Sequence, residues 1–314
     1  AAWNVCHQPW QQSQMCIRAS FFSLYLTMYV HKTNPGLPCP RRPIVSCPGS
    51  LLHPLGVWLD SQLQMIARGM PSYIQSSFTL KQQLSQLDIP PQGISLGSAD
   101  AVNMYGNIPQ RRCLRVIAKY LRDNTHLHPE VKVEATIQAL NLVMKFNIFT
   151  FGDMTFLQKK GMAMGTPPAP TVVTIYFAIE ENSFLVVFTN RLKYYGRYLD
   201  DVFYIWKHHP NAYMDSQIWQ QFKDAMNARS GLTWEFTELS QKVDFLDITI
   251  SNTSGVLTTT LYEKPQNLHL YIPPHSAHAP GLLPGMVFGT LFRIYTLCTA
   301  EEDRSRGPRS STKG

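Results

Sequence analysis

Two adjacent aspartates, Asp200 and Asp201, lie in the middle of the stretch YYGRYLDDVFYIW, residues 194–206. The runs on either side are aromatic and branched, a composition typical of paired β-strands. Aspartate is unfavourable in strands, and neighbouring carboxylates repel each other unless a cation offsets their charge. The pair therefore has two interpretations: an ordinary hairpin turn, or a turn that presents carboxylates to a divalent metal.

The metal interpretation requires a third carboxylate from a separate strand. Metal-dependent phosphoryl transfer to a 3′-hydroxyl uses two divalent ions held by such carboxylates. Asp100 in SADAVNMYGNIP stands where a predicted strand runs into an acidic position. It is the candidate for this third ligand, and a turn that begins with aspartate is the alternative.

A tyrosine that follows Asp100 could contact the sugar of a nucleotide. Tyr105 lies five residues after Asp100, where it could pack under the sugar of an incoming nucleotide. Such a ring would crowd a 2′-hydroxyl and so select deoxynucleotides. The alternative is an ordinary core tyrosine.

A turn rich in glycine and proline, LQKKGMAMGTPPAPT, lies between the acidic sites. Gly161 and Gly165 would let the backbone approach a ligand closely. Gln158 and Lys160 could contact a template or a phosphate. The alternative is a helix entry after a loop.

In this order and spacing the segments resemble the motifs of reverse transcriptases. ADAVNMYGNIP is similar to their motif A, QKKGMAMGTPPAP to motif B, and YLDD to the Tyr-x-Asp-Asp of motif C. HKTNPGLPCPRRPIVSCPGS resembles their fingertip motifs, and Lys32 and Arg42 occupy the places of the lysine and arginine that hold the triphosphate. NIP, VDFLDITI and LYEKPQNLHLYIPPHSAHAP look most like the telomerase-related Penelope-like retroelements. The resemblance runs from about Leu26 to about Cys298.

The resemblance implies an α+β fold, a right-hand polymerase of fingers, palm and thumb whose antiparallel palm sheet carries the active site. Expected divisions are partial fingers with the fingertip motifs at 1–75, a palm with inserted fingers helices and motifs A to D at 76–250, the start of a thumb at 251–300, and a disordered tail at 301–314. The family's segment before the fingertips is expected to be missing, so the chain looks like a fragment. Ser276-Ala277-His278-Ala279-Pro280 departs from the family's Ser-Cys-His-Pro, and no GIY-YIG endonuclease follows.

The implied function is that of a retroelement RNA-directed DNA polymerase, which transfers dNTPs to a primer 3′-hydroxyl. Expected partners are an RNA template, a DNA or RNA primer and dNTPs, with no membrane, in an intracellular, nuclear location. The implied cofactor is Mg²⁺, as two ions, with Mn²⁺ as a substitute. The implied roles are metal binding by Asp100 and Asp200 with help from Asp201, triphosphate binding by Lys32 and Arg42, the sugar check by Tyr105, support of template and nucleotide by Gln158 and Gly165, and proton donation to pyrophosphate by Lys242.

Two other functions compete with this interpretation. An RNA-dependent RNA polymerase shares the metal-binding aspartates, but it should accept a 2′-hydroxyl, and Tyr105 disfavours that. The alternative from another class is a catalytically silent or domesticated nucleic-acid-binding fragment. Retention of all three aspartates speaks against such decay.

Another acidic pair, Asp244 and Asp247, lies in VDFLDITI, which is predicted to be one strand. A spacing of three would place these side chains on opposite faces of a strand. We therefore expect both to be structural.

Hydrophobic periodicity predicts the remaining elements. Helices are expected over 53–70, 77–87, 111–123, 133–146 and 216–231, strands over 43–46, 232–239, 243–250 and 255–264, and hairpins over 147–158 and 194–206. Strands and helices do not alternate regularly, which favours an α+β architecture over a doubly wound sheet.

Composition supports a folded protein with a polyanionic partner. The chain is 44% hydrophobic and 16% charged, and 28 Lys+Arg against 21 Asp+Glu give a net charge of +7. The six cysteines form no CxxC pair and no zinc-like array, so free thiols in a reducing compartment are expected. Apolar runs fall short of the roughly 20 residues that span a membrane, and the run TVVTIYFAI is expected to stop at Glu180 and Glu181.

Overall fold

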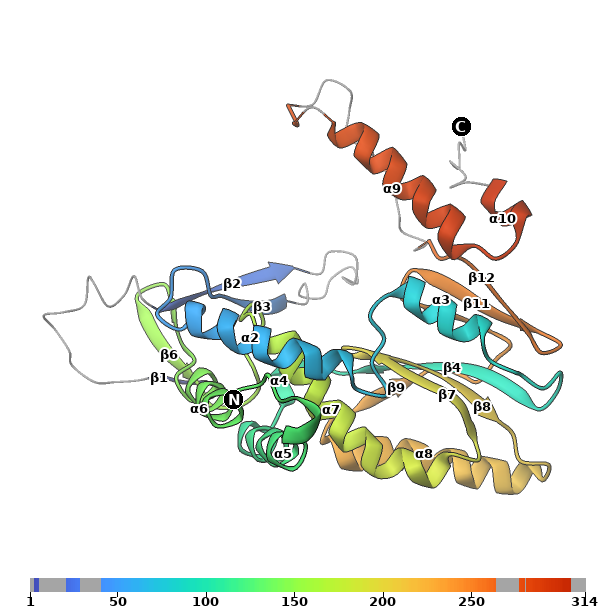
Figure 1. Ribbon diagram of the computed structural model, residues 1–314, viewed down its shortest axis with the longest axis horizontal. Coiled ribbons are helices and arrows are strands. Elements are labelled where there is room, and N and C mark those ends of the chain that lie inside the picture. Colours follow the sequence, from blue (N-terminus) through green and yellow to red (C-terminus); the bar gives the residue numbers. More distant parts are fainter. Residues whose placement is uncertain (1–2, 6–20, 29–40, 264–276, 280, 306–314) are drawn as a thin grey trace, which may run out of the picture. The chain divides into compact units, whose positions relative to one another are not determined.

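The computed structural model describes residues 3–5, 21–28, 41–263, 277–279 and 281–305 (Figure 1). The chain divides into two compact units, each assembled from segments far apart in sequence. The first unit holds Ala1–Tyr73, Ala101–Val187 and Gln220–Trp234, and the second holds Ile74–Asp100, Phe188–Trp219 and Glu235–Gly314. The division into fingers, palm, thumb and tail stays a prediction.

A four-stranded sheet in the second unit carries the predicted aspartates. Its order is β7 (Leu192–Tyr198), β8 (Asp201–Lys207), β4 (Ile94–Ala101) and β9 (Trp234–Phe236). β8 pairs antiparallel with both β7 and β4. Residues 202–206 of β8 are all buried, because a central strand packs on both faces. This explains the unbroken apolar run VFYIW.

The aspartate hairpin is confirmed, with Leu199 and Asp200 as its two-residue turn. Tyr198 pairs with Asp201 directly before and after that turn. Leu199 has a φ of +53°, an unusual conformation for a branched side chain. The buried Arg197 donates from Nη1 to the Leu199 carbonyl at 3.1 Å. Arg197 thus supports a turn conformation that leucine on its own would not favour.

A three-stranded antiparallel sheet, also in the second unit, corrects one prediction. It consists of β10 (Lys242–Phe245), β11 (Ile248–Thr253) and β12 (Val256–Leu261). The expectation of one strand over 243–250 is wrong, because the chain reverses at Leu246 and Asp247. Leu246 also has a φ of +53°. The turn contains no glycine or asparagine, the residues that usually signal a turn. The sequence therefore offers no reason to divide the apolar segment into two strands.

Asp247 joins this turn to two helices of the second unit, α3 (Ser77–Ser85) and α9 (Leu282–Leu297). Its carboxylate accepts hydrogen bonds from the Ser77 hydroxyl and from Arg293 Nη2, the latter at 2.8 Å. Lys81 of α3 donates to the carbonyls of Thr296 and Cys298 at 2.7 and 3.0 Å, where a cation suits the C-terminus of α9. These contacts agree with a structural role for Asp247.

The expected disordered tail is also corrected in part. Glu301–Ser305 form the short helix α10, and residues 306–314 lie outside the described residues. The first residues of α10 are acidic, and negative charge is favourable at a helix N-terminus. The polar composition that suggested disorder therefore also suits a short helix.

The first unit contains a five-stranded sheet and most of the helices (Figure 1). The sheet order is β1 (Trp3–Val5), β6 (Met154–Gln158), β5 (Ile148–Phe151), β2 (Phe22–Met28) and β3 (Arg41–Ser46). The helices are α2 (His53–Arg68), α4 (Met104–Asn107), α5 (Gln110–Asp123), α6 (Val133–Lys145), α7 (Ala169–Leu185) and α8 (Ala212–Ser230), which begins in the second unit. The five predicted helices and the β5–β6 hairpin are confirmed.

α7 is longer than its acidic residues suggested. Together with a short 3₁₀ turn it runs from Ala169 to Phe188, long and apolar enough by length and composition alone to cross a membrane. The expectation that Glu180 and Glu181 interrupt the run is wrong. Arg112 forms two hydrogen bonds to Glu180 at 3.0 and 2.7 Å, and the Ser72 hydroxyl donates to Glu181 at 2.8 Å. Most of the segment is buried, as in the core helix of a folded protein.

A hydrogen-bonded chain joins β4, β8 and the start of α8 in the second unit. His208 Nδ1 lies 2.6 Å from Asp215 Oδ2, and His208 Nε2 lies 2.8 Å from the Ser95 hydroxyl. Asp215 also accepts from the His209 backbone N–H and from Trp206 Nε1. Ser95 is 7% exposed, so this Ser–His–Asp arrangement is a packing device and no substrate reaches the hydroxyl. Burial alone would raise the pKa of Asp215, but the hydrogen bonds from these donors hold its pKa below the usual range.

We expect Asp215→Asn to lower the free energy of unfolding by about 2 kcal/mol at pH 7, because hydrogen bonds to a charged acceptor are lost. A native pKa below the unfolded value of about 4 means that the contribution is complete above about pH 5 and disappears as pH falls below 4. Denaturant unfolding across pH measures this. Asp224→Asn, on an exposed part of the same helix, is the control, and a deficit that persists unchanged at pH 3 would contradict the expectation.

Candidate active site

Strand register brings the predicted aspartates to one end of the four-stranded sheet. Asp100, the penultimate residue of β4, is the direct cross-strand partner of Asp201, the first residue of β8. Directly opposed residues have their Cβ atoms about 5 Å apart. Asp200 precedes Asp201 in the turn, so all three carboxylates come from two neighbouring strand ends. Asp100 is exposed, and the other two are half-buried.

These strand ends line a cleft of about 340 Å³ within the second unit. The lining residues are Ser98, Ala99, Asp100, Asp201, Glu235, Phe236, Thr237, Asp244, Phe245 and Leu246. Two of the four carboxylates, Glu235 and Asp244, were not predicted to be here. Their position depends on how β9 and the β10–β11 hairpin lie beside β4, which local sequence patterns do not encode.

The carboxylates at the strand ends have the chemistry that Mg²⁺ requires. Mg²⁺ prefers oxygen ligands, and in phosphoryl-transfer sites one or two carboxylates commonly hold it together with water and substrate phosphates. Within the described parts of the chain, no group of three or more His, Cys, Asp or Glu residues is arranged to hold a metal by itself. Two carboxylates, Asp100 and Asp201, are the number that an ion shared with substrate in this way would use. A cation there would also relieve the repulsion between opposed carboxylates.

In the first unit, the turn that resembles motif B is fastened to the segment after Asp100. The Met162 N–H donates to the Tyr105 carbonyl at 2.7 Å, and the Gly161 N–H donates to the Ile108 carbonyl at 2.9 Å. Gly161 has a φ of +79°, and a Cβ atom there would lie 2.4 Å from the Tyr105 oxygen. Only glycine permits this close approach of two backbones.

The same turn is fastened on its other side to β3. The Val45 N–H donates to the Met164 carbonyl at 2.8 Å. Gly165 has a φ of +101°, and a Cβ atom there would lie 2.3 Å from the Val45 oxygen. β3 also carries Arg42, whose side chain is not described. Three segments predicted to handle the nucleotide thus meet in the first unit.

The structure does not test the predicted roles of the remaining site residues. Gln158 is buried, with its amide nitrogen 2.9 Å from the Lys160 carbonyl and its amide oxygen accepting from Asn147 at 2.6 Å. In this structure Gln158 holds the turn, and a contact with template stays a prediction. Lys242 is exposed at the start of β10 and does not line the cleft, so its role as a proton donor also stays a prediction. Lys32 lies outside the described residues.

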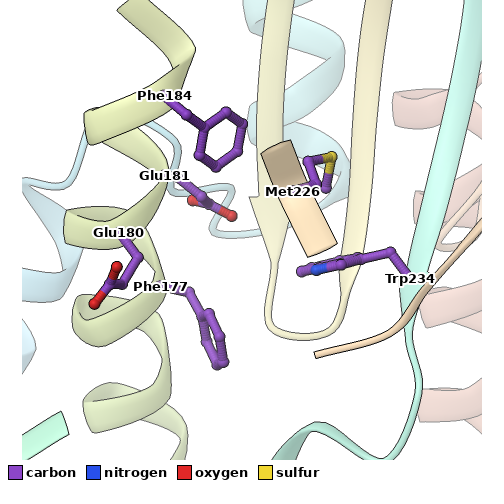
Figure 2. A pocket seen from close by; sticks show the side chains of 6 residues that line it. All are labelled: Phe177, Glu180, Glu181, Phe184, Met226 and Trp234. Atoms are coloured by element: carbon purple, nitrogen blue, oxygen red, sulfur yellow. The ribbon is translucent and has the colours of Figure 1, made fainter. Parts of the chain in front are cut away.

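Figure 2 shows a smaller cavity in the first unit, between side chains of α7 and α8 and the side chain of Trp234. Its volume is about 10 Å³, which is at most the room that one water needs. It is lined by Phe177, Glu180, Glu181, Phe184, Met226 and Trp234. The two glutamates are engaged by Arg112 and Ser72, as described above. This cavity is a packing gap between core elements and holds no substrate.

The fold is α+β with mainly antiparallel sheets, and it is similar to the folds of nucleic-acid polymerases. Telomerase from Candida tropicalis is similar with a TM-score of 0.57 and 12% identity, over 81% of this chain and 49% of the telomerase chain. Telomerase from Candida albicans, solved with a TWJ fragment of telomeric RNA, is similar with a TM-score of 0.56 and 11% identity, over 81% and 48% of the two chains.

A viral enzyme shares the fold as well. The BmCPV RNA-dependent RNA polymerase in its elongation state is similar with a TM-score of 0.51 and 9% identity, over 79% of this chain and 22% of the viral chain. No family model and no curated protein matches the sequence. At such low identities the likeness establishes the fold, and this chain spans about half the length of the telomerase chains.

Proposed function

We propose that this chain carries the catalytic core of a reverse transcriptase, an RNA-directed DNA polymerase that adds dNTPs to a primer 3′-hydroxyl. The observation that carries the proposal is the register of Asp100 opposite Asp201, beside the Asp200 turn, on a cleft in a polymerase-like fold. The sequence motifs favour a retroelement enzyme of the Penelope-like type.

In this proposal Asp100, Asp200 and Asp201 hold Mg²⁺, with Mn²⁺ as a substitute. When bound, the two ions would activate the primer hydroxyl and neutralise charge on the triphosphate and the departing pyrophosphate. The protein contributes rigidity: paired strands fix the carboxylates of Asp100 and Asp201, and Arg197 supports the turn that carries Asp200. Preorganised ligands need little rearrangement during the reaction.

The nucleotide is handled by the segments that meet at the motif-B turn. Lys32 and Arg42 would hold the triphosphate, and Tyr105 would exclude a 2′-hydroxyl from the sugar site. Gly165 would help to support the nucleotide, and Lys242 would protonate pyrophosphate. The support for this part is the pair of backbone contacts that fasten the turn to Tyr105 and to β3.

Template and sugar selectivity test the proposal. On oligo(dT)-primed poly(rA) we expect extension with dTTP and little with UTP. Tyr105→Ala opens the sugar site and should lower the ratio of dTTP to UTP incorporation about tenfold or more. Tyr105→Phe keeps the ring and should retain the wild-type ratio. Extension by the wild-type protein with UTP in preference to dTTP would contradict the proposal. That result would favour an RNA polymerase, a second candidate that the likeness to the viral enzyme supports.

A further inference from the structure

Helix α5 and the segment before it are basic, and two of their cations, Arg111 and Arg115, lie on one face of the helix. Residues 101–122 contain five Lys and Arg and no Asp or Glu. Three of these cations are paired, because Arg112 contacts Glu180, Lys119 contacts Asp123 and Arg122 contacts Glu134. Arg111 and Arg115 are exposed, and their side chains form no ion pair or hydrogen bond with any described residue.

Two lysines extend this positive charge onto the motif-B turn. Gln110, the first residue of α5, donates from Nε2 to the Gly161 carbonyl at 2.9 Å. Lys160 donates from Nζ to Asn107 Oδ1 at 2.9 Å, and its neighbour Lys159 is exposed. The turn therefore adjoins the start of α5. We call Arg111, Arg115, Lys159 and Lys160 the basic stripe; all four belong to the first unit.

We propose that the basic stripe binds the sugar–phosphate backbone of a nucleic acid, an inference that rests on the proposed polymerase function. Arg111 and Arg115 lie one helical turn apart, about 6 Å along the axis, so both guanidinium groups can reach phosphates of one strand. Guanidinium groups suit bidentate contacts with phosphate oxygens. Binding of this kind positions the duplex and does not depend on its sequence.

A protein partner fits this surface less well. Protein interfaces have an apolar and aromatic centre. Among the described residues, no exposed large apolar side chain lies between residues 103 and 126 or between 155 and 185. A surface that offers cations without an apolar centre suits a phosphate backbone.

The test is binding of a fluorescently labelled RNA–DNA hybrid, measured by anisotropy without dNTPs, so that no catalysis is required. Arg111→Gln with Arg115→Gln should weaken binding roughly tenfold or more at 0.1 M salt. It should also reduce the slope of log affinity against log salt by about 2, because two phosphate contacts are lost. Lys159→Gln alone should reduce the slope by about 1.

The matched control is Lys119→Gln with Arg122→Gln, which removes two charges from the same helix where both cations already have acidic partners. We expect this control to change affinity less than about threefold. An equal loss in both double variants would show that affinity follows net charge, and would overturn the inference. Tight wild-type binding that Arg111→Gln with Arg115→Gln leaves unchanged would overturn it while sparing the proposed function. Failure of the wild-type protein to bind the hybrid would count against both.

Discussion

Replacing Asp200 or Asp201 by asparagine, one at a time, is expected to slow primer extension by about 10³-fold or more. Loss of a carboxylate ligand removes several kcal/mol of charge stabilisation from the transition state, and about 4 kcal/mol corresponds to 10³ in rate. Steady-state incorporation of dTMP on a primed poly(rA) template measures the effect. Asp224→Asn, an exposed change of the same charge on α8, should retain wild-type activity.

Replacing Asp200 or Asp201 by asparagine should leave the metal-free fold intact or make it slightly more stable. Asp201 lies directly opposite Asp100, and like charges in that position are destabilising. We expect metal-free Asp201→Asn to gain about 0.5 kcal/mol in unfolding free energy. Mg²⁺ should raise the melting temperature of the wild-type protein more than that of the variant, because binding to the native state stabilises it. A folded Asp200→Asn or Asp201→Asn protein with normal activity would refute the assigned roles.

Gly161→Ala is expected to disrupt the motif-B turn. The added Cβ would lie 2.4 Å from the Tyr105 carbonyl oxygen, and alanine at a φ of +79° is itself strained. The turn must then move, which breaks the contacts of Gly161 with Ile108 and of Met162 with Tyr105. We expect a loss of about 2–4 kcal/mol in unfolding free energy, together with a higher KM for dTTP. Denaturant unfolding and steady-state extension measure the two effects.

Gly152→Ala separates the steric clash from the backbone strain. Gly152 also has a positive φ, +59°, but a Cβ atom there would meet nothing within 4 Å. We expect a loss of about 1 kcal/mol in stability and no change in KM, because only the conformational preference is lost. Equal effects of the two alanines would show that contact with Tyr105 is not what makes Gly161 necessary.

Two hairpins show what the sequence could and could not predict. YLDD and FLDI both turn at a Leu-Asp pair in which Leu199 or Leu246 has a φ of +53°. Neither turn contains the glycine or asparagine that usually signals such a conformation. The first was recognised because adjacent carboxylates between two apolar runs need an explanation. The second could not be predicted because VDFLDITI is apolar apart from its two aspartates and Thr249, a composition that suits one continuous strand.

The sequence likewise predicted only part of the candidate site. Asp100, Asp200 and Asp201 could be predicted because their strands and turn are local features, each with its own pattern. Glu235 and Asp244 could not be placed beside them, since that depends on how separate strands associate. Gln158 lies at the motif-B turn as predicted. Its side-chain amide, however, is buried in contacts with Asn147 and Lys160 instead of being free to contact a template.

The most direct test of the central claim is single-nucleotide extension of an RNA-templated DNA primer, with and without Mg²⁺. The wild-type protein is expected to lengthen the primer by one dTMP and to release pyrophosphate only when the divalent ion is present, and Asp201→Asn is expected to do neither. A folded wild-type protein that binds the hybrid but forms no product with Mg²⁺ or Mn²⁺ would contradict the proposed function.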